Sequence, residues 1–233
     1  MESHVSLFTA IKEKDILLSY PYQSFNYVID LLREAAIDPK VRSIKITLYR
    51  VAKNSKVINA LINAAKNGKA VTVIVELQAR FDEENNIYYA NKLQEEGIKV
   101  NFGIAGLKVH TKIILIRRKE TNKNVYYAHI GTGNFNEKTS EIYCDHSFLT
   151  ANTKITNEVK KVFAFFKDNY KRHVFRYLLV SPFNTRRQFI KLVKTEIANA
   201  SAGLPAGVTI KVNNLNDEEM ANVLYEASEA GVK

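Results

Sequence analysis

Hydrophobic and polar positions along the chain follow two periods, which alternate from one segment to the next. Segments whose apolar side chains recur every three or four residues are expected to form helices, because that spacing places them on one face. They cover residues 25–36, 57–66, 83–95 and 157–169. Runs rich in β-branched residues are expected to form strands and cover residues 41–49, 71–77, 98–102, 106–116 and 125–130. This order predicts an α/β fold with a sheet flanked by helices.

A weak internal repeat extends this pattern toward the C-terminus. Ile44–Leu48 followed by the helix that ends at Ala60–Lys69 resembles Ile210–Asn214 followed by Val223–Lys233. The second copy stops where the first would enter its next strand, which suggests a truncated piece of a larger, two-lobed protein. The alternative is that any two strand–helix–glycine units look alike, because such units share a period.

The charge and cysteine content limit the functional classes. Lys and Arg number 34 against 24 Asp and Glu, a formal net charge of +10, so a polyanionic partner is expected without its identity being fixed. Cys144 is the single cysteine, which excludes an intramolecular disulfide and fits a reducing compartment. No apolar run approaches transmembrane length, so a cytoplasmic protein without a transmembrane segment is expected.

The most informative chemistry lies in two short segments. Lys108, His110 and Lys112 are separated by single residues, so a strand would place one imidazole between two ammonium groups on the same face. That arrangement is costly unless an anion lies between them. The turn Gly131–Asn136 is rich in glycine, and its backbone N–H groups could cradle phosphate oxygens. Together the two segments predict phosphoryl transfer through a nucleophilic histidine.

Four separated motifs, in order, resemble the long polyphosphate kinase family, which is built on a phospholipase-D-like fold. They are Ile46–Arg50, Val75–Glu84, Gly106–Lys112 and Gly131–Asn136. The resemblance runs from about Leu7 to Lys233 and covers only part of that enzyme. It implies a phospholipase-D-like α/β lobe with a mixed sheet at residues 21–178. An N-terminal segment would occupy residues 1–20, and the truncated start of a second similar lobe residues 179–233.

The resemblance also implies roles for the residues that match the family motifs. His110 matches the histidine that the family phosphorylates, and Tyr143 matches a nucleotide-contacting tyrosine. Arg50 and Arg80 match arginines near the phosphate and magnesium. They are not expected as direct metal ligands, because a guanidinium has no lone pair to donate.

Lys112 and Asn134 resemble the Lys and Asn of the phospholipase-D signature and are expected to act with the histidine. Lys108, Gly131 and Thr132 are expected to contact the phosphates of ATP. The chain departs from the signature twice: Arg117 stands where an Asp is expected, and Thr132 replaces a Ser. The first departure leaves open which group orients the imidazole.

The implied reaction is reversible transfer of the γ-phosphate of ATP to inorganic polyphosphate through a phosphohistidine, with Mg²⁺ as cofactor. The isolated fragment is expected to be inactive or weakly active, because most of the second lobe is missing. The implied partners are ATP or ADP and polyphosphate, with a homo-oligomer for the full-length enzyme and no specific nucleic acid. The location would be cytoplasmic, with peripheral membrane association left open. The alternatives are a phospholipase-D-like phosphodiesterase and a non-catalytic, basic polyanion-binding module.

Overall fold

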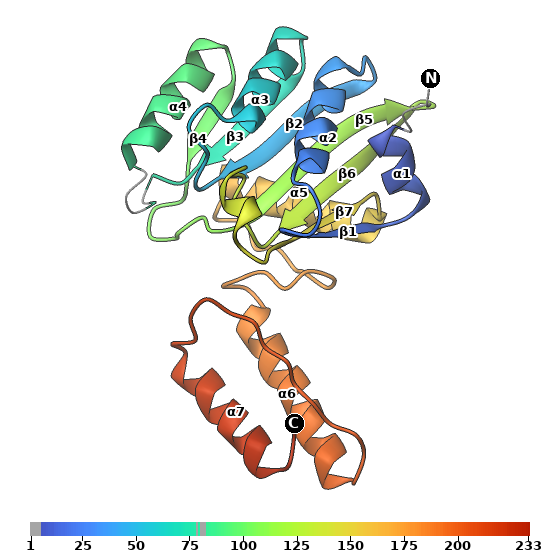
Figure 1. The fold of residues 1–233 in the computed structure, drawn as a ribbon, viewed down its shortest axis with the longest axis vertical. Coiled ribbons are helices and arrows are strands. Elements are labelled where there is room, and N and C mark those ends of the chain that lie inside the picture. Colours follow the sequence, from blue (N-terminus) through green and yellow to red (C-terminus); the bar gives the residue numbers. More distant parts are fainter. Residues whose placement is uncertain (1–5, 78, 80–82) are drawn as a thin grey trace. The chain divides into compact units, whose positions relative to one another are not determined.

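One mixed sheet forms the centre of the first of two compact units, residues 1–173 and 174–233 (Figure 1). The computed structural model describes residues 6–77, 79 and 83–233. Among these, the strand order is β1-β7-β6-β5-β2-β3-β4. The neighbours β2, β3 and β4 are parallel, and the remaining pairs are antiparallel. The strands are β1 (Ile16–Ser19), β2 (Val41–Leu48), β3 (Ala70–Val75), β4 (Lys99–Phe102), β5 (Lys112–Glu120), β6 (Lys123–Gly131) and β7 (His146–Thr150).

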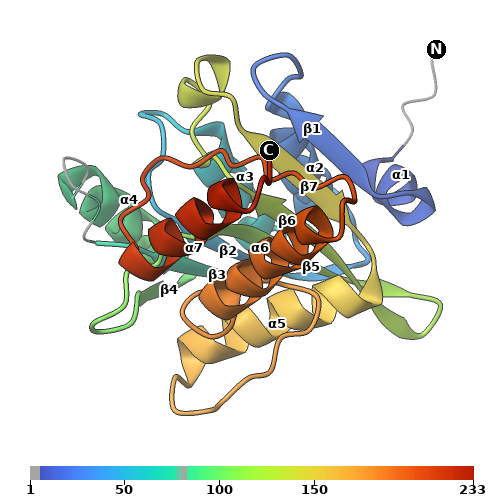
Figure 2. The same cartoon turned by 90° about the horizontal axis from the view of Figure 1, so that it is seen from below.

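Helices cover both faces of the sheet (Figures 1 and 2). One face carries α2 (Asn26–Ile37), α3 (Lys56–Lys66) and α4 (Glu83–Glu95), and the opposite face carries α5 (Thr153–Lys167). The short α1 (Leu7–Glu13) contacts α2 and β7, and a 3₁₀ helix, η1 (Thr139–Glu141), precedes β7. The expected mixed sheet with flanking helices is thus confirmed for this unit.

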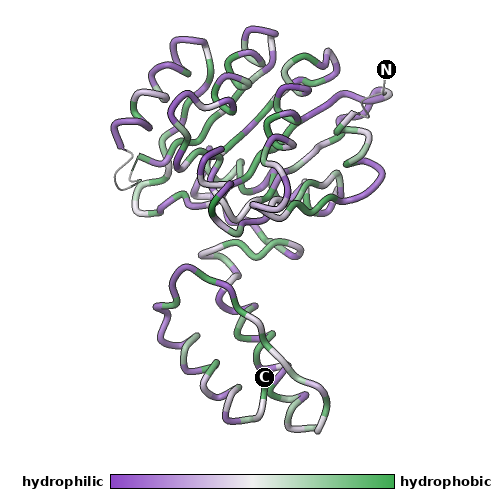
Figure 3. Tube along the Cα trace, in the orientation of Figure 1, coloured by the Kyte–Doolittle hydropathy of each residue, from purple (hydrophilic) through white to green (hydrophobic). Residues whose placement is uncertain are grey.

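The core lies mainly between the sheet and α2 and α3, where Figure 3 shows apolar segments along the central strands. Alternate residues of β2, namely Ile44, Ile46 and Leu48, are buried in this layer. Their spacing of two is that of a strand with one face on the core. Ser55 starts α3 by accepting hydrogen bonds from the backbone N–H groups of Val57 and Ile58.

Two elements at the start of the chain do not stand out in the hydrophobic pattern. Within the N-terminal segment expected at residues 1–20, the described residues 6–20 contain α1 and β1 and belong to the first unit. β1 is an edge strand that pairs antiparallel with β7, from Ile16 opposite Leu149 to Ser19 opposite His146. β1 and β7 are too short for an alternation of apolar and polar residues to stand out in the sequence.

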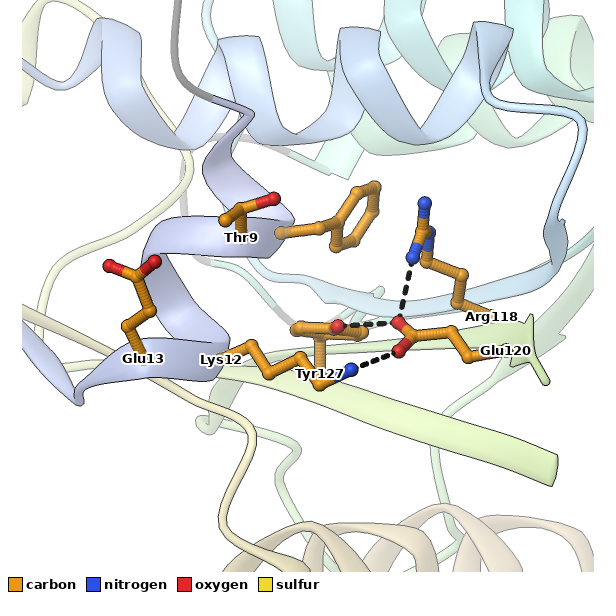
Figure 4. A pocket seen from close by; sticks show the side chains of 7 residues that line it. Thr9, Lys12, Glu13, Arg118, Glu120 and Tyr127 are labelled. Carbon is orange, nitrogen blue, oxygen red and sulfur yellow. Dashed lines mark hydrogen bonds and ion pairs between the residues drawn. The ribbon is translucent and has the colours of Figure 1, made fainter.

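A network of hydrogen-bonded, mostly charged side chains connects α1 to the C-terminal end of β5 and to β6 (Figure 4). Glu120 accepts hydrogen bonds from Lys12, Arg118 and the hydroxyl of Tyr127, at 2.6, 2.8 and 2.6 Å. Arg118 also donates to Asp38 at 2.7 Å. Burial opposes ionisation of Glu120, but these donors outweigh it and lower its pKa to about 2. The network borders a cavity next to Phe8. Its acidic and basic side chains form ion pairs with one another.

The second unit contains two helices, α6 (Thr185–Ser201) and α7 (Glu218–Glu229). They pack through Val193, Val223 and Ala227. The strand expected at Ile210–Asn214 is not formed, and this prediction is wrong for the present chain. A strand needs a neighbour to satisfy its backbone groups, and residues 174–233 contain no other strand. That residues 179–233 begin a second catalytic lobe stays a prediction.

Of the helices that the structure describes, none combines the length and the apolar character needed to cross a lipid bilayer.

Candidate functional site

Tyr49, directly after β2, is the centre of a cluster of basic side chains. Its ring is buried, with 8% of the residue exposed, and meets the imidazole of His110 edge to face at 4.8 Å between ring centres. Three cations approach the same ring: Lys112 at 5.1 Å, Arg50 at 5.4 Å and Lys108 at 5.6 Å. Aromatic faces attract cations at such distances. The structure thus brings four of the predicted site residues together.

The segment that carries His110 is not the strand that the sequence predicts. β5 begins only at Lys112, and residues 108–111 are irregular. The chain turns at Gly106, which has a φ of +77°, so the preceding residues leave the line of the sheet. Val109 is consequently buried, and His110 is exposed at the surface. An exposed imidazole is accessible to a substrate.

Side-chain hydrogen bonds take the place of a strand ladder in this segment. The backbone N–H of Val109 donates to the carboxylate of Glu76 at 2.6 Å. The hydroxyl of Thr47 donates to the carbonyl of Thr111 at 2.7 Å and accepts the N–H of Ile113 at 3.1 Å. Glu76 and Thr47 are themselves buried at the ends of β3 and β2. The two parallel strands therefore hold the His110 segment at their carboxyl ends, where α/β sheets place ligand sites.

The surroundings of His110 favour its neutral form. Partial desolvation lowers the pKa of its imidazole, and the charges of Lys112, Lys108 and Arg50 lower it further, in that order. The ring forms no hydrogen bond within the part of the chain that the structure describes. A neutral imidazole has a free lone pair, so His110 is suited to nucleophilic attack near neutral pH.

Lys112 is buried at the start of β5, with 3% of the residue exposed. Its ammonium group donates a hydrogen bond to the carbonyl of His110. Burial lowers the pKa of Lys112 to about 8, although the carboxylate of Asp145 opposes this effect and Arg50 adds to it. An ammonium group in such surroundings gains from a bound anion, which restores the favourable charge balance.

Strand pairing places the predicted glycine-rich turn beside Lys112, because Gly131 lies opposite it in the β5–β6 ladder. The two glycines of the turn are required by close approach of side chains. A Cβ at Gly133 would lie 2.5 Å from Oδ2 of Asp145, and one at Gly131 would lie 2.8 Å from Cε1 of His129. Any larger residue would have to displace these neighbours.

Thr132 already forms hydrogen bonds within the protein, so the turn does not offer all of its N–H groups to a phosphate. Its N–H donates to the carbonyl of His146 at 3.0 Å, and its hydroxyl donates to Asp145 at 2.8 Å. The same hydroxyl accepts the N–H of His146 at 2.9 Å. The N–H groups of Gly133 and Asn134 form no hydrogen bond within the described residues and are the donors left for a ligand.

The other predicted residues are less closely tied to His110. The side-chain oxygen of Asn134 is buried without a hydrogen-bond partner among the described residues. Tyr143 is 60% exposed and lies two residues before Asp145. Arg80 lies outside the described residues.

Two further histidines, His129 and His146, lie on β6 and β7. Nε2 of His129 is 2.7 Å from the hydroxyl of Ser147, and complete burial lowers the pKa of this imidazole to about 3. Nδ1 of His146 is 3.0 Å from the hydroxyl of Ser19. The buried, neutral imidazole of His129 packs against Gly131 of the glycine turn.

Sequence reasoning did not single out Tyr49, Glu76 and Asp145. The first two had a signal, because Tyr49 and Glu76 each stand at the end of an apolar run, where α/β folds place ligand sites. Asp145 had none, since only the β6–β7 pairing brings it to the turn.

The described residues contain no group of three or more His, Cys, Asp or Glu side chains that could hold a metal ion. Mg²⁺ often keeps one or two protein carboxylates at most and takes its other ligands from phosphates and water. The carboxylates of Asp145 and Glu76 accept hydrogen bonds from Thr132 and Val109, and the basic side chains around Tyr49 suit the phosphate oxygens through which Mg²⁺ would be held.

Comparison with protein families gives two matches that together cover most of the chain. Residues 6–172 match the model of "Polyphosphate kinase C-terminal domain 1", and residues 178–233 match "Polyphosphate kinase C-terminal domain 2". The polyphosphate kinase of Escherichia coli K12 is 56% identical over 225 residues, 97% of this chain and 33% of that protein. That of Vibrio cholerae is 52% identical over 232 residues, again 33% of its length.

Solved structures agree. The chain superposes on the polyphosphate kinase of Porphyromonas gingivalis with a TM-score of 0.87 and 41% identity, covering 100% of this chain and 39% of that one. A phospholipase D family member, Nuc from Salmonella typhimurium, matches with a TM-score of 0.51 and 18% identity over 67% of this chain and 93% of that one. The second likeness concerns the fold alone. The chain spans about a third of the length of the curated relatives it matches.

Proposed function

Because this chain belongs to the polyphosphate kinase family, we propose that it carries the histidine through which the γ-phosphate of ATP passes to inorganic polyphosphate. The observation that carries this proposal is the cluster around Tyr49. In this cluster the exposed imidazole of His110 lies among Lys108, Lys112 and Arg50, whose charges favour its neutral form. A nucleophile surrounded by cations suits a highly charged phosphoryl donor.

In the proposed step, a ring nitrogen of His110 attacks the γ-phosphorus in line with the bond to the β-phosphate oxygen. The N–P bond forms, the P–O bond breaks, and ADP leaves with the bonding electrons. In the second step the terminal oxygen of a polyphosphate attacks the phosphohistidine. The N–P bond breaks, the imidazole is restored and the polymer is one unit longer. Reversal of both steps returns ATP.

The surrounding groups stabilise the charge that develops on the transferred phosphoryl group. The charged groups of Lys112, Arg50 and Lys108 lie near the Tyr49 ring. At the turn, the N–H groups of Gly133 and Asn134 can donate hydrogen bonds to phosphate oxygens. Charge-assisted hydrogen bonds of this kind contribute about 1.5–3 kcal/mol each. We assign Lys112 and Asn134 to the catalytic step.

Three further parts of the proposal rest on the family resemblance. Tyr143 contacts the nucleotide, Arg80 holds phosphate oxygens together with Arg50, and Gly131 and Thr132 shape the phosphate site. Mg²⁺ bound to phosphate oxygens would neutralise part of their charge. For the full-length enzyme we propose a homo-oligomer in the cytoplasm, with peripheral membrane association as an open variant.

Labelling of the histidine tests the proposal. The chain is incubated with γ-labelled ATP or labelled polyphosphate and analysed on an alkaline gel, and mass spectrometry then maps the phosphate. An acid-labile, alkali-stable label on His110 is expected, and His110→Ala and His110→Gln should abolish it. His146→Ala is the matched control, because this side chain is exposed and its imidazole hydrogen-bonds with Ser19.

Other outcomes point to the alternatives. Binding of polyphosphate without any label would favour a non-catalytic polyanion-binding module. Hydrolysis of a phosphodiester would favour a phospholipase-D-like phosphodiesterase. A label mapped to His129 or His146 would overturn the assignment of His110.

A further inference from the structure

A second group of basic residues lines a pocket on the sheet face that carries α5, away from the Tyr49 cluster. The pocket has a volume of about 300 Å³. Three of its lining residues are cations, Lys45, Arg117 and Lys160, and none is acidic. The other lining residues are Ser43, Ala70, Thr72, Leu115 and Tyr126.

Strand register explains why these cations meet. Ser43 of β2 lies opposite Arg117 of β5, and Lys45, two residues on, lies opposite Leu115. Paired residues point to the same side of a sheet, so Lys45 and Arg117 share one face. Lys45 also pairs with Thr72 of β3, and Thr72 pairs with Lys99 of β4.

Helix α5 adds its own cations to this face. Lys160 lines the pocket, and its ammonium group lies 5.0 Å from the centre of the Tyr126 ring. Lys167 is seven residues further along and therefore lies on the same side of the helix. Burial lowers the pKa of Lys45, and so do the charges of Lys167, Arg117, Lys160 and Lys99. The five cations are thus close enough to repel one another.

No described carboxylate compensates this charge. Lys45, Arg117 and Lys160 form no ion pair within the described residues, whereas Arg118, the next residue after Arg117, pairs with both Asp38 and Glu120. Nε of Arg117 is buried without a hydrogen-bond partner among the described residues. Buried donors of this kind usually have a partner, so the pocket is built as if for an acceptor that carries negative charge.

We propose that this pocket binds a phosphate group of an inorganic polyphosphate chain, at a position separate from the phosphoryl group at His110. The proposal rests on the proposed function, because the same polymer would reach both sites. Lys45 and Tyr49 are four residues apart in and beyond β2, a separation of about 13 Å at the rise of a strand. A long chain can span that distance, and a short one can occupy only one site.

The chemistry of the pocket favours a phosphate chain over a nucleic acid. A planar guanidinium and two ammonium groups, with the hydroxyls of Ser43 and Thr72 beside them, match the oxygens of a compact anion. Single-stranded nucleic acids are held largely by stacking of bases on aromatic rings. The one aromatic ring that lines the pocket, Tyr126, is already covered by Lys160.

Binding measurements on the 233-residue chain test the proposal. Calorimetry at fixed ionic strength compares long-chain polyphosphate, tripolyphosphate and ATP. The variant K45Q/R117Q/K160Q should lose at least tenfold in affinity for the long chain and change less than threefold for ATP. The matched control K14Q/R33Q/K123Q removes the same charge from exposed positions and should change affinity for the long chain less than twofold.

A footprint on the unsubstituted chain does not depend on whether the triple variant folds. An amine-reactive reagent is applied with and without long-chain polyphosphate, and mass spectrometry measures the modification of Lys45 and Lys14. Protection of Lys45 alone supports the pocket. Equal protection of both lysines, equal losses in the two triple variants, or equal protection of Lys45 by a single-stranded oligonucleotide would overturn the proposal.

Failure of the pocket and failure of the proposed function give different results. Labelling of His110 from ATP should proceed in K45Q/R117Q/K160Q at a rate within twofold of the parent chain. If the label forms but the long chain binds equally well to both, the pocket is wrong and the phosphohistidine stands. If Lys45 is protected but no label forms, the pocket stands as a polyanion site and the catalytic proposal fails.

Discussion

The rings of Tyr49 and His110 meet edge to face, 4.8 Å apart and at an angle of 78°. In this contact the Tyr49 ring packs directly against the imidazole, in a chain where Arg117 stands at the position for which the resemblance implied an Asp. Arg117 lies in the basic pocket with Lys45, so it is not the group that holds His110. The aromatic ring packs against the imidazole and adds no negative charge beside it.

Removal of the Tyr49 ring should loosen the site. Tyr49→Leu is expected to slow labelling of His110 about tenfold, because aromatic pairs and cation–π contacts contribute about 0.5–1.5 kcal/mol each. Tyr49→Phe should be nearly unchanged, since the hydroxyl forms no hydrogen bond within the described residues. Rates from single-turnover labelling decide the matter, and equal loss in both variants would show that the ring is not the positioning group.

The pKa of His110 should respond to its neighbours in a fixed order. Removing a nearby positive charge favours the imidazolium, so Lys112→Met should raise the pKa toward the ordinary histidine value, and Lys108→Met should raise it less. Lys123→Met, at an exposed position, should leave it unchanged. Titration of the ring protons by NMR in the free protein measures each value. A fall in the pKa of the Lys112 variant would contradict the site electrostatics.

The glycine turn should tolerate a methyl group poorly. Gly133→Ala is expected to destabilise the chain by about 1–3 kcal/mol, because the new Cβ would lie 2.5 Å from the Asp145 carboxylate. Gly103→Ala is the matched control, since its Cβ would meet Glu76 and Val109 at an ordinary 3.6 Å. Denaturant unfolding compares the two. Partial recovery in Gly133→Ala/Asp145→Ala is expected if the clash is the cause.

Glu120 should contribute stability that disappears in acid. Its pKa is lowered to about 2 in the folded chain, so its contribution is present above the ordinary glutamate value, near 4.5, and is lost as the pH falls toward 2. Glu120→Gln should cost about 1.5–3 kcal/mol at pH 7, the range for charge-assisted hydrogen bonds. Asp30→Asn is the control, because the Asp30–Arg33 pair is about half exposed and such pairs contribute little.

Unfolding of Glu120→Gln and the parent chain as a function of pH gives the check. The two stabilities should converge as the pH falls from 4.5 to 2. A constant difference across that window would mean that the substitution acts through packing and not through the charge.

Much of the fold is determined by local patterning along the chain. The alternation of apolar residues in β2 and the helical spacing of α2 and α3 act through neighbours in sequence, so their burial could be predicted. That Lys108 and Lys112 lie close to His110 could also be predicted, because only single residues separate them. The short strands β1 and β7 could not, since four or five residues carry too little pattern.

Tertiary structure alone decided how these pieces meet. The predicted strand through His110 gave way to an irregular segment because Glu76 and Thr47, distant in sequence, bind its backbone. Tyr49 reaches His110 across 61 residues, and Asp145 reaches Gly133 only through the pairing of β6 with β7. The basic pocket likewise needs the register of β2 with β5 and the placement of α5. Sequence determines which groups a segment carries, but contacts between distant segments depend on the packing of the whole sheet.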